Sequence, residues 1–577
     1  MIRTGPAPRC RWRLLPEDPG RRDALRRALD LHPLVAQVLV NRGCADPAAA
    51  RSMLSPSLGE LPDPELLPDF ERAVAACAAA LDGNRPILIH GDYDVDGIAG
   101  SALLARLCRL LGRPAEVFLP DRVEDGYSFS ERSLDRIRRL GAGLVVAVDN
   151  GTGAVDFIGR IRALGAEVVV LDHHPPGPAV PDAAVVNPWR APAEAGLFPH
   201  FCGTAVAYLF VWGLLRRRAA GALPESWRRF LIDALGLAAL ATVADVMPLR
   251  GPNRALVAEG LRTLGNSGFP GLAALARVAG VRAEPSAADA AFRLAPRLNA
   301  AGRLGRPDLA FELLACGEAR RAELLAVELD ELNCRRREIE QEEMRRLEPQ
   351  VEEQLQRGDP VLFCGRPEGR FGVLGIVAAR LVEATGRPAL VWAGCGDGLA
   401  RGSGRAPEGF DLAELLAAAD PWLDGHGGHA RAAGFHFQPD RAGQVGAALR
   451  RAAAELPPPA PPELLVDAEV GVAELSPGLV ERLGSLAPFG EGNPEPLFLA
   501  SGLELAALRP IGDGSHLELR LQRNGHAVRA LGWRRAEDWS GLEPGDRLDV
   551  LFHPTLNRFR GRASVEWTLR DLRPVQG

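Results

Sequence analysis

The pattern of hydrophobic positions changes several times along the chain. From about residue 85 to residue 190, short apolar runs alternate with amphipathic segments. The runs are rich in β-branched residues and have the length of strands, whereas the segments between them have helical spacing. This alternation predicts a mostly parallel sheet with helices on its faces. The strand-like runs are RPILIH, AEVFLP, GLVVAVD and AEVVVLD, and the helical segments include SALLARLCRLLG and GAVDFIGRIRALG.

Other patterns predict the regions on either side of this sheet. Residues 1–70 have a helical pattern and end in a connector rich in Pro and Asp. The parallel sheet and a mostly helical region after it are expected to form one domain, residues 71–317. Residues 318–357 are one long charged stretch with an interrupted apolar seam, which is typical of a helix that connects two domains.

The C-terminal part predicts two further domains. A second α/β pattern begins near VLFCG, so we expect a domain over residues 358–455. The Pro-rich tract ELPPPAPPE (455–463) then predicts a semi-rigid linker. Beyond it, the tail 464–577 alternates between apolar and polar residues with the period of strands, in HLELRLQ, HAVRALGW, DRLDVLFHP and ASVEWTLRDL. This tail is expected to form a small β-barrel.

Composition changes this picture little. The 577 residues exceed what one core can organise, and 47% hydrophobic with 25% charged residues is typical of a soluble globular protein. The net charge of −6 does not point to nucleic acid or to a membrane, so an anionic substrate would need local basic patches. All 68 basic residues are Arg, so the number of Arg residues alone says little about binding.

The cysteines and the chain start indicate the compartment. Nine cysteines without a CxxC pair argue against a zinc ribbon or a disulfide scaffold and favour a reducing cytoplasm. The N-terminal residues lack the apolar core of a signal peptide. Asp233 and Asp245 interrupt the most apolar helical stretch, so no membrane span is expected. We therefore expect a cytoplasmic protein.

Acids and histidines follow three of the strand-like runs at once. A single Asp after a strand is usually a turn or cap residue. Three such ends, however, meet at one edge of a parallel sheet and indicate one site. Asp245, in the apolar context ATVADVMPL, is a fourth contribution. The residues after the runs are His90, Asp92, Asp94 and Asp96 in HGDYDVDG, Asp149 in VDNG, and Asp172, His173 and His174.

The ligand types in this cluster predict the metal. Carboxylates and imidazoles without thiolates favour Mn²⁺ or Mg²⁺ over structural zinc. The number of ligands indicates two ions that share one carboxylate. Two such ions would activate a water and stabilise both oxygens of an in-line phosphoryl displacement. The sequence therefore predicts a two-metal phosphoesterase site.

Motif order adds a resemblance to a known family. DYDVDG, VDNG, DHH and ADVMPL occur in the order of the four motifs of the DHH phosphoesterase superfamily, and GFDLAELLAAADPWLDGHGGHARAAGF resembles its DHHA1 accessory domain. LVAQVLVNRG, EDGYSFS, PRLNAAGRLG and APFGEGNPEP resemble the RecJ family of bacterial single-strand-specific exonucleases. The resemblance implies an α/β fold with a parallel-sheet DHH domain, a long helix, a DHHA1 domain and a C-terminal OB-like barrel.

The same resemblance implies roles for the candidate ligands. One ion would be held by His90, Asp94 and Asp149, and the other by Asp96, Asp149, His173 and Asp245, with Asp149 as the bridge. Asp92 would be a further ligand or would position one. His174 would lie near the scissile phosphate as an electrostatic or acid group; alternatively, it orients His173.

Phosphate-binding residues are expected in the DHHA1 domain. RGSGRAPEGF places Ser403 and Arg405 in a glycine-rich turn, where N–H groups, a hydroxyl and a guanidinium form a good phosphate pocket. GHGGHARAAGF adds His429 and small residues that allow a nucleotide backbone to approach. By resemblance, these residues would bind a 5′-terminal phosphate.

Three other arginines are candidates outside this motif. Arg122 precedes EDGY, and Arg303 lies in NAAGRLG, where the alternative is a charge at a helix C-terminus. The family usually has a His two residues before Gly-Val-Ile-Gly, where this chain has Arg370. A guanidinium there would keep a phosphate contact, but the chain lacks the imidazole.

The tail carries a last basic cluster. In RFRGR, the residues Arg558, Arg560 and Arg562 are expected on one face of an extended strand. On an OB-like barrel, such a row indicates a groove for a single strand. The alternative is an exposed strand edge, which also favours charge.

Together with the resemblance, these expectations describe a Mn²⁺- or Mg²⁺-dependent exonuclease that degrades single-stranded DNA and releases mononucleotides. The preference for DNA over RNA and the 5′–3′ polarity rest on the resemblance. It also implies a role in recombination and repair, with a RecQ-type helicase and single-strand-binding protein as partners. One alternative is a DHH-family phosphoesterase for oligoribonucleotides or small phosphate substrates, which would not need the N-terminal segment, long helix and barrel. The other is a non-catalytic replication scaffold, which would be expected to lack motif acids and histidines.

Overall fold

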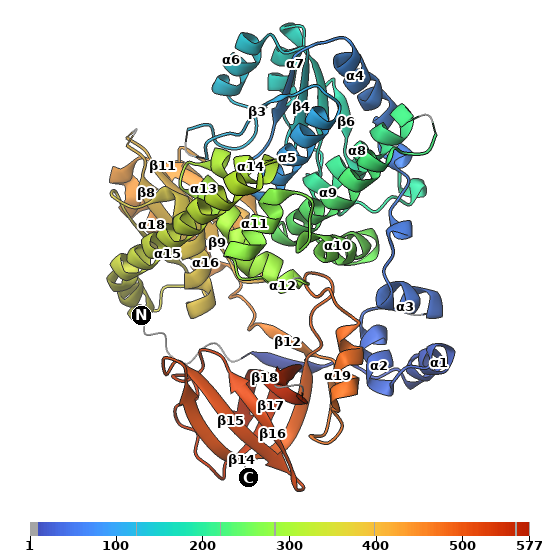
Figure 1. Ribbon diagram of the computed structural model, residues 1–577. Coiled ribbons are helices and arrows are strands. Elements are labelled where there is room, and N and C mark those ends of the chain that lie inside the picture. The colour runs from blue at the N-terminus through green and yellow to red at the C-terminus, as the bar shows by residue number, and fades with distance from the viewer. Residues whose placement is uncertain are drawn as a thin grey trace. The chain divides into compact units, whose positions relative to one another are not determined.

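The chain is described by a computed structural model that covers residues 10–44, 46–122, 124–219, 221–281, 284–396, 398–559 and 562–575 (Figure 1). Arg560 lies outside these described residues. The chain forms two compact units: the first contains Met1–Leu54, Glu338–Ala487 and Glu495–Gly577, and the second contains Ser55–Arg337 and Pro488–Pro494. The limits of the five expected domains stay a prediction.

A five-stranded parallel sheet forms the centre of the second unit, in the order β3-β2-β4-β5-β6. It confirms the parallel sheet and the four strands expected from the sequence. The fifth strand, at Ala184–Val186, was not expected from the sequence. The strands are β2 (Ile87–His90), β3 (Glu116–Phe118), β4 (Leu144–Val148), β5 (Glu167–Leu171) and β6 (Ala184–Val186).

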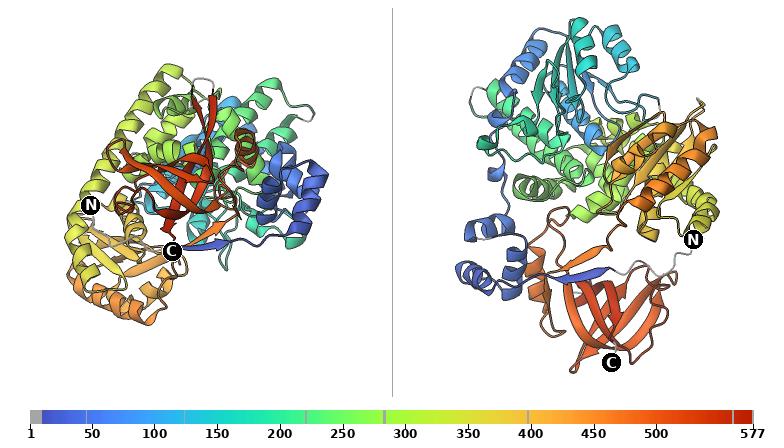
Figure 2. Two further views of the ribbon diagram at one scale, coloured as in Figure 1. Left: turned by 90° about the horizontal axis from the view of Figure 1, so that it is seen from below. Right: turned by 180° about the vertical axis from the view of Figure 1, so that it is seen from behind.

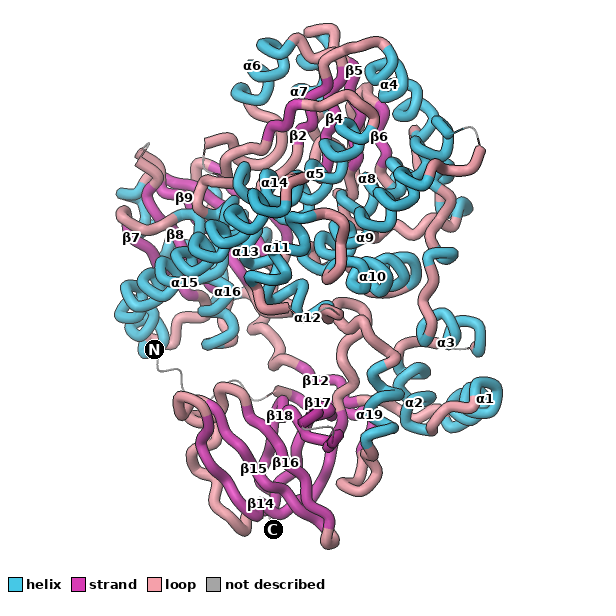
Figure 3. The backbone as a smooth tube through the Cα atoms, in the orientation of Figure 1, coloured by secondary structure: helices cyan, strands magenta, loops and turns pink. Residues whose placement is uncertain are grey.

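Both faces of this sheet are covered, which explains why most positions of its strands are apolar. In β4, Leu144, Val146 and Val148 belong to one core cluster, whereas Val145 and Ala147 belong to the other. Helices α4 (Phe70–Asp82), α5 (Val95–Leu110) and α8 (Gly203–Ala219) supply the first cluster, and α6 (Glu131–Leu140) and α7 (Val155–Ala163) supply the second (Figure 3).

Helices follow the sheet, as the sequence predicts for residues 190–315. Buried apolar residues of these helices belong to the same core cluster as those of α4, α5 and α8. The helices are α9 (Glu225–Ala244), α10 (Gly251–Leu264), α11 (Pro270–Val278), α12 (Ala287–Asp289), a π-helical turn η5 (Ala290–Leu294), α13 (Ala295–Arg303) and α14 (Pro307–Ala315).

The long helix α15 (Ala319–Gln356) contributes to the cores of both units. Its apolar seam is interrupted because the two halves pack against different partners. Leu325 and Leu329 are buried in the core of the second unit. Leu347 and Val351 are buried in the first unit, against a second α/β sheet.

This second sheet is mixed, with the order β10-β11-β9-β8-β7. Side chains of α15 bind its edge strand. Gln354 accepts a hydrogen bond from the backbone N–H of Phe363 at 2.8 Å and donates to its carbonyl oxygen at 3.1 Å. Gln350 makes the same pair of bonds with Gly365, at 3.0 and 3.1 Å. The elements are β7 (Leu362–Arg366), β8 (Ala389–Gly394), β9 (Ala400–Arg405), β10 (Gly425–His429), β11 (Ala432–Phe437), α16 (Leu374–Thr385), α17 (Leu412–Ala417) and α18 (Ala442–Glu455).

The tail forms the expected barrel, which closes through pairing of its first and fourth long strands. Its interior is aromatic: the rings of Phe552 and Trp567 stack with centroids 3.7 Å apart. The strands are β13 (Ala468–Glu469), β14 (Phe498–Ile511), β15 (His516–Arg523), β16 (His526–Gly532), β17 (Arg547–Phe559) and β18 (Arg562–Pro574), and α19 (Pro477–Gly484) precedes β14.

The N-terminal segment differs from the purely helical prediction. It contains α1 (Pro19–Leu29), α2 (Pro33–Asn41) and α3 (Pro47–Leu54), but it begins with a strand, β1 (Arg11–Leu14). This strand pairs in parallel with β12 (Glu463–Val466), after the Pro-rich tract (Figure 2). A buried ion pair also joins the N-terminal segment to the chain after β12: Arg42, which follows α2, lies 2.7 Å from Asp467. A four-residue strand with a distant partner leaves no periodic signal, so the sequence pattern missed it.

No helix among the described residues combines the length and the apolar composition that are needed to cross a membrane.

Candidate active site

The parallel sheet delivers the first part of the site at the carboxyl ends of three neighbouring strands. His90 ends β2, Asp149 follows β4, and Asp172 follows β5. Strands β2, β4 and β5 pair in register, so these three positions lie along one edge of the sheet. The structure thus brings the strand ends together, as the sequence predicts.

The loop after β2 folds tightly against the first turn of α5. Asp94 caps this helix and accepts hydrogen bonds from the backbone N–H groups of Asp96 (2.9 Å) and Gly97 (3.2 Å). A Cβ atom at Gly97 would lie 2.3 Å from the backbone nitrogen of Asp92, so only glycine fits there. The acids of this motif are therefore close together because the loop folds directly into the first turn of α5.

Asp96 is bound by the N-terminus of another helix. Its carboxylate accepts hydrogen bonds from the backbone N–H groups of Gly203 (2.6 Å) and Thr204 (2.7 Å), at the start of α8. The positive end of the helix dipole stabilises the negative charge of Asp96 there. His173 Nε2 lies 3.8 Å from the same carboxylate.

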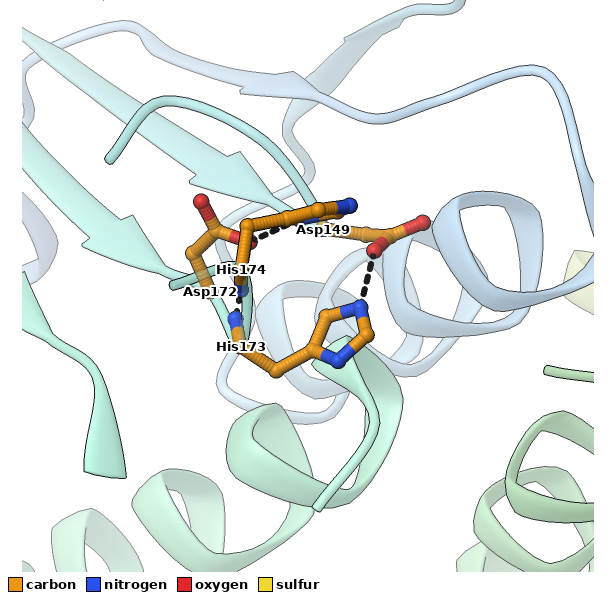
Figure 4. Close-up of side chains that lie close together, drawn as sticks. All are labelled: Asp149, Asp172, His173 and His174. Atoms are coloured by element: carbon orange, nitrogen blue, oxygen red, sulfur yellow. Dashed lines mark hydrogen bonds and ion pairs between the residues drawn. The ribbon is translucent and has the colours of Figure 1, made fainter. Parts of the chain in front are cut away.

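Asp149 occupies the centre of the cluster and has a strained backbone. Its φ of 64° lies in the left-handed region, which is uncommon for a residue other than glycine. Asp149 Oδ1 is 3.1 Å from Nε2 of His173 (Figure 4). Two effects raise the pKa of Asp149 well above its ordinary value: burial, which is the larger, and repulsion from the acids around it.

Asp245 reaches the site from the end of α9. Its Oδ2 lies 3.6 Å from His173 Nε2. Burial and then repulsion from Asp96 and Asp94 raise the pKa of Asp245 to about 8. The sequence singled out this residue by its apolar context and by the family motif ADVMPL, and the structure places it beside His173.

Ligand atoms lie within 4.8 Å of one another in three groups. The groups are Asp149 with Asp172, His173 and His174; Asp96 with His173 and Asp245; and Asp92 with Asp94 and Asp149. The second group contains three of the four residues expected for the second ion and lacks Asp149. In the first expected set, however, the structure groups Asp92, rather than His90, with Asp94 and Asp149.

His90 is nevertheless available as a ligand. It is fully buried between Phe118 and Phe129, with ring centroids 5.4 and 4.1 Å away. Neither ring nitrogen has a hydrogen-bond partner among the described residues, and burial lowers the pKa of His90 to about 4, so the ring is neutral.

The donor set fits a pair of divalent cations. Oδ1 of Asp92 and Oδ2 of Asp245 are buried and also lack hydrogen-bond partners in the described part of the chain. Burial and repulsion from Asp94 raise the pKa of Asp92 well above its ordinary value. Carboxylates this close are stable as anions only with compensating positive charge, and their oxygen atoms suit Mn²⁺ or Mg²⁺.

Asp172 has a role that the sequence did not assign. Its Oδ1 accepts hydrogen bonds from the backbone N–H of His173 and from Nδ1 of His174, both at 2.8 Å (Figure 4). Its Oδ2 accepts the N–H of Thr152 at 2.9 Å. Burial alone would lower the pKa of His174, but the hydrogen bond with Asp172 and the charge of Asp172 raise it to about 9. His174 is therefore protonated at neutral pH.

Tyr127, in the EDGYSFS segment, is a site residue that sequence reasoning missed. Its hydroxyl lies 3.2 Å from His174 Nδ1 and 3.3 Å from the carbonyl oxygen of Asp149. Asp125 fixes the loop by accepting hydrogen bonds from the backbone N–H of Asp121 and the hydroxyl of Ser130. The only signal was the family match of this segment.

A cleft of about 390 Å³ opens onto these residues. Two expected arginines, Arg122 and Arg303, line it together with the acids. Arg303 is also in the last turn of α13, so its two expected roles are compatible. Arg122 lies over the ring of Tyr93, 5.3 Å from its centroid. The cleft thus combines candidate cation ligands with two guanidinium groups, which are suited to bind phosphate.

Ser403 and Arg405, which are expected to bind phosphate, lie on a strand of the first unit. The glycine-rich turn expected around them is therefore wrong. Ser403 and Arg405 are alternate residues of β9, and Arg405 Nη1 donates to Ser403 Oγ at 3.0 Å. Both side chains reach the start of α16, because a Cβ atom at Gly375 would meet them within 3.2 Å. Arg370 directly precedes the turn that leads into α16. His429 and Arg405 pair with the same residue, Ala432, on opposite sides of β11.

The arginine row expected in the tail is wrong in its geometry. Arg558 lies in β17 and Arg562 in β18, two strands that pair in antiparallel fashion, so they do not share one extended strand. Arg558 also forms an ion pair with Glu481. Arg560 is outside the described residues, so the expected groove is not established by these arginines.

Comparison with known proteins agrees with the order of these regions. A family model described as the DHH family, N-terminal domain, matches residues 86–242. The DHHA1 domain matches residues 358–455, and the RecJ OB domain matches residues 466–571.

Two curated relatives are similar over nearly the whole chain. The single-stranded-DNA-specific exonuclease RecJ of Thermus thermophilus is 36% identical and covers 98% of this chain and 79% of its own length. The protein of the same name from Escherichia coli is 33% identical and covers 95% of this chain and 96% of its own length.

Solved structures show the same fold. The crystal structure of RecJ from Thermus thermophilus in complex with Mn²⁺ has a TM-score of 0.84, with 33% identity, 99% of this chain covered and 80% of that chain covered. The Mg²⁺ complex from the same organism has a TM-score of 0.77, with 32% identity and coverages of 99% and 79%. Given the motif order, the three matched domains and these full-length similarities, the chain belongs to the RecJ family of single-stranded-DNA-specific exonucleases.

Proposed function

We propose that the chain is a Mn²⁺- or Mg²⁺-dependent exonuclease that hydrolyses single-stranded DNA from the 5′ end and releases mononucleotides. The observation that carries the proposal is that three ligand groups, two of which contain Asp149, lie at a cleft that is also lined by Arg122 and Arg303. The relatives named as single-stranded-DNA-specific exonucleases support the substrate, and the OB-domain match supports binding of a single strand.

Two divalent ions would be held by the clustered residues of the second unit. Asp149 belongs to two of the three ligand groups, which supports its role as the bridge. Asp96, His173 and Asp245 would hold one ion. Asp92, Asp94 and His90 are the candidates for the other. When bound, the two ions would lower the pKa of a water molecule and stabilise the charge that develops on the phosphate oxygens.

The chain's own groups then bind the substrate and manage protons. Arg122 and Arg303 would bind non-bridging phosphate oxygens along the cleft. Protonated His174 faces the same cleft, and Asp172 keeps its proton in place. His174 is therefore suited to stabilise negative charge or to donate a proton to the leaving oxygen.

A second anion site in the first unit supports exonuclease rather than internal cleavage. Ser403 and Arg405 meet at the start of α16, where the helix dipole and backbone N–H groups favour an anion. We assign the 5′-terminal phosphate to these residues, with Arg370 and His429 as further contacts.

Cellular context extends the proposal. We infer work in recombination and repair beside a RecQ-type helicase and single-strand-binding protein, on the family resemblance. A cytoplasmic location is supported by the cysteines, because all nine lie among the described residues and are free thiols.

Digestion of long single strands that are blocked at either end, with Mn²⁺ and with Mg²⁺, tests the polarity. Mononucleotides are expected from the 3′-blocked strand and not from the 5′-blocked one.

A 5′-labelled dinucleotide tests the alternative phosphoesterase, because that enzyme would prefer the dinucleotide to the long strand. If Asp149→Ala retained nuclease activity with Mn²⁺, the catalytic proposal for this site would be wrong, whereas a wild type without activity would favour a non-catalytic scaffold.

A further inference from the structure

The segment Pro488–Pro494 has no role in the function described above, although it carries the GEGNP part of a family motif. It belongs to the second unit, whereas the chain on both sides of it, at Ala487 and Glu495, belongs to the first. Seven residues of the tail are therefore part of the unit that holds the metal ligands.

The segment is a closed turn that fixes its own shape. The backbones of Gly490 and Asn493 exchange two hydrogen bonds, of 2.9 and 3.1 Å. The Asn493 side chain donates a third hydrogen bond, of 2.8 Å, to the carbonyl oxygen of Pro488. The turn therefore presents its remaining carbonyl groups in fixed directions.

These carbonyl groups bind the residues that follow Asp245. The backbone N–H of Leu249 donates to the carbonyl oxygen of Glu491 at 2.7 Å. Nε of Arg250 donates to the carbonyl oxygen of Gly492. Gly492 has a φ of +71°, and a Cβ atom there would lie 3.3 Å from both Pro248 and Arg250.

Between Asp245 and this anchor, the backbone is strained. Val246 has a φ of +56°, a conformation that is costly for a β-branched residue, and its side chain is 62% exposed. Such a conformation persists only when the structure on both sides imposes it. On one side, the N–H groups of Asp245 and Met247 donate to the last turn of α9. On the other side, the hydrogen bond from Leu249 to Glu491 holds the chain in place.

We propose that the turn Pro488–Pro494 is a positioning element for Asp245. By holding Leu249 and Arg250, it keeps the strained chain after α9 in the conformation that directs the Asp245 carboxylate toward His173. The inference rests on the proposed role of Asp245 as a metal ligand. Glu491 and Gly492 act through backbone carbonyl groups, and neither residue belongs to a ligand group or lines the cleft.

Binding of Mn²⁺ to the metal-free, full-length protein tests this role, measured by calorimetry and by the electron paramagnetic resonance of bound Mn²⁺. Gly492→Ala strains the turn, and Arg250→Gln removes one anchor while the glycine backbone is kept. Loss of outer contacts of this kind weakens metal affinity by about 10- to 100-fold. We expect each variant to bind one of the two Mn²⁺ ions more weakly by this factor. Its nuclease activity should be regained at higher Mn²⁺ concentration, and its KM for DNA should be unchanged.

Two comparison variants make the result decisive. Gly478→Ala in α19 adds a Cβ atom with no heavy atom within 4 Å, and it should bind Mn²⁺ like the wild type. If Asp245→Asn also binds like the wild type, the ligand role and the inference fail together. If Asp245→Asn weakens binding and both turn variants do not, the inference alone is wrong. Arg250→Gln decides if Gly492→Ala does not fold.

Discussion

Asp172 and His174 form a hydrogen-bonded pair, with Oδ1 of the acid 2.8 Å from Nδ1 of the imidazole, and the acid is buried while His174 faces the cleft. The pairing explains how a partly buried histidine stays protonated at neutral pH. Because the pKa of His174 is raised to about 9, the stability from this pair is present in full below the ordinary histidine pKa and is lost as the pH rises through 9.

Asp172→Asn should lower the pKa of His174, because an amide does not stabilise the imidazolium. Proton titration of labelled histidines in the metal-free protein checks this shift directly. Removing such a supporting carboxylate costs about 10- to 100-fold in activity, so kcat should fall by that factor. Asp156→Asn, on the exposed side of α7, is the matched control and should change neither quantity. An unchanged His174 titration in Asp172→Asn would contradict the assignment.

Removal of the metal should make stability depend on pH. The pKa of Asp245 is raised to about 8 in the folded protein, so the folded state holds a proton that the unfolded state releases near pH 4. The metal-free protein should therefore lose stability as the pH rises from about 4 to about 8. Thermal unfolding with a chelator at a series of pH values measures this loss.

Mn²⁺ should reverse the loss at high pH, because the ion binds the deprotonated carboxylates and releases their protons. In Asp245→Asn without metal, the fall in stability with pH should be smaller than in the wild type. An equal slope in the variant and the wild type would mean that other groups cause the dependence.

Gly97→Ala should damage the site, because the added Cβ would lie within 2.6 Å of three atoms of Asp92. Overpacking of this kind costs about 1–3 kcal/mol, and the displaced Asp92 should weaken Mn²⁺ binding. Gly159→Ala in α7 meets no atom within 4 Å and should instead stabilise by about 0.5–1 kcal/mol. Chemical unfolding of both variants, together with Mn²⁺ titration, compares them; equal stability would refute the steric argument.

Arg122→Gln and Arg303→Gln should weaken binding of single strands of any sequence. Each lost phosphate contact should reduce the slope of log affinity against log salt by about 1. Fluorescence anisotropy with labelled oligonucleotides at several salt concentrations measures the slope. Arg337→Gln, on the exposed surface of α15, should leave the slope unchanged. A salt slope equal to that of the wild type in both cleft variants would exclude them from phosphate binding.

Much of this arrangement could be read from the sequence, because its signals are local. Parallel strands buried on both faces give continuous apolar runs, and acids directly after them mark the carboxyl edge. His90, Asp149 and His173 were therefore placed correctly at one edge. The barrel was also predicted, since its last four strands alternate clearly.

The remaining features depend on contacts between distant residues, for which one sequence carries no periodic signal. Tyr127 contacts His174 across 47 positions, and β1 pairs with a strand some 450 residues away. Ser403 was expected in a turn because glycines usually mark turns, but here the glycines lie in β9, where the sheet and α16 pack closely. The RFRGR row failed because Arg558 and Arg562 lie on two different strands of the barrel.

The amides of Gln350 and Gln354 act as a substitute for a sixth strand at the edge of the mixed sheet. An edge strand with free N–H and C=O groups is a template on which another chain can add. In β7, the groups of Phe363 and Gly365 are already satisfied by α15. A fragment that starts at residue 358 would lose this cover and should self-associate, whereas one that includes α15 from residue 338 should stay monomeric in sedimentation. The long helix thus protects the second sheet from aggregation as well as joining two parts of the chain.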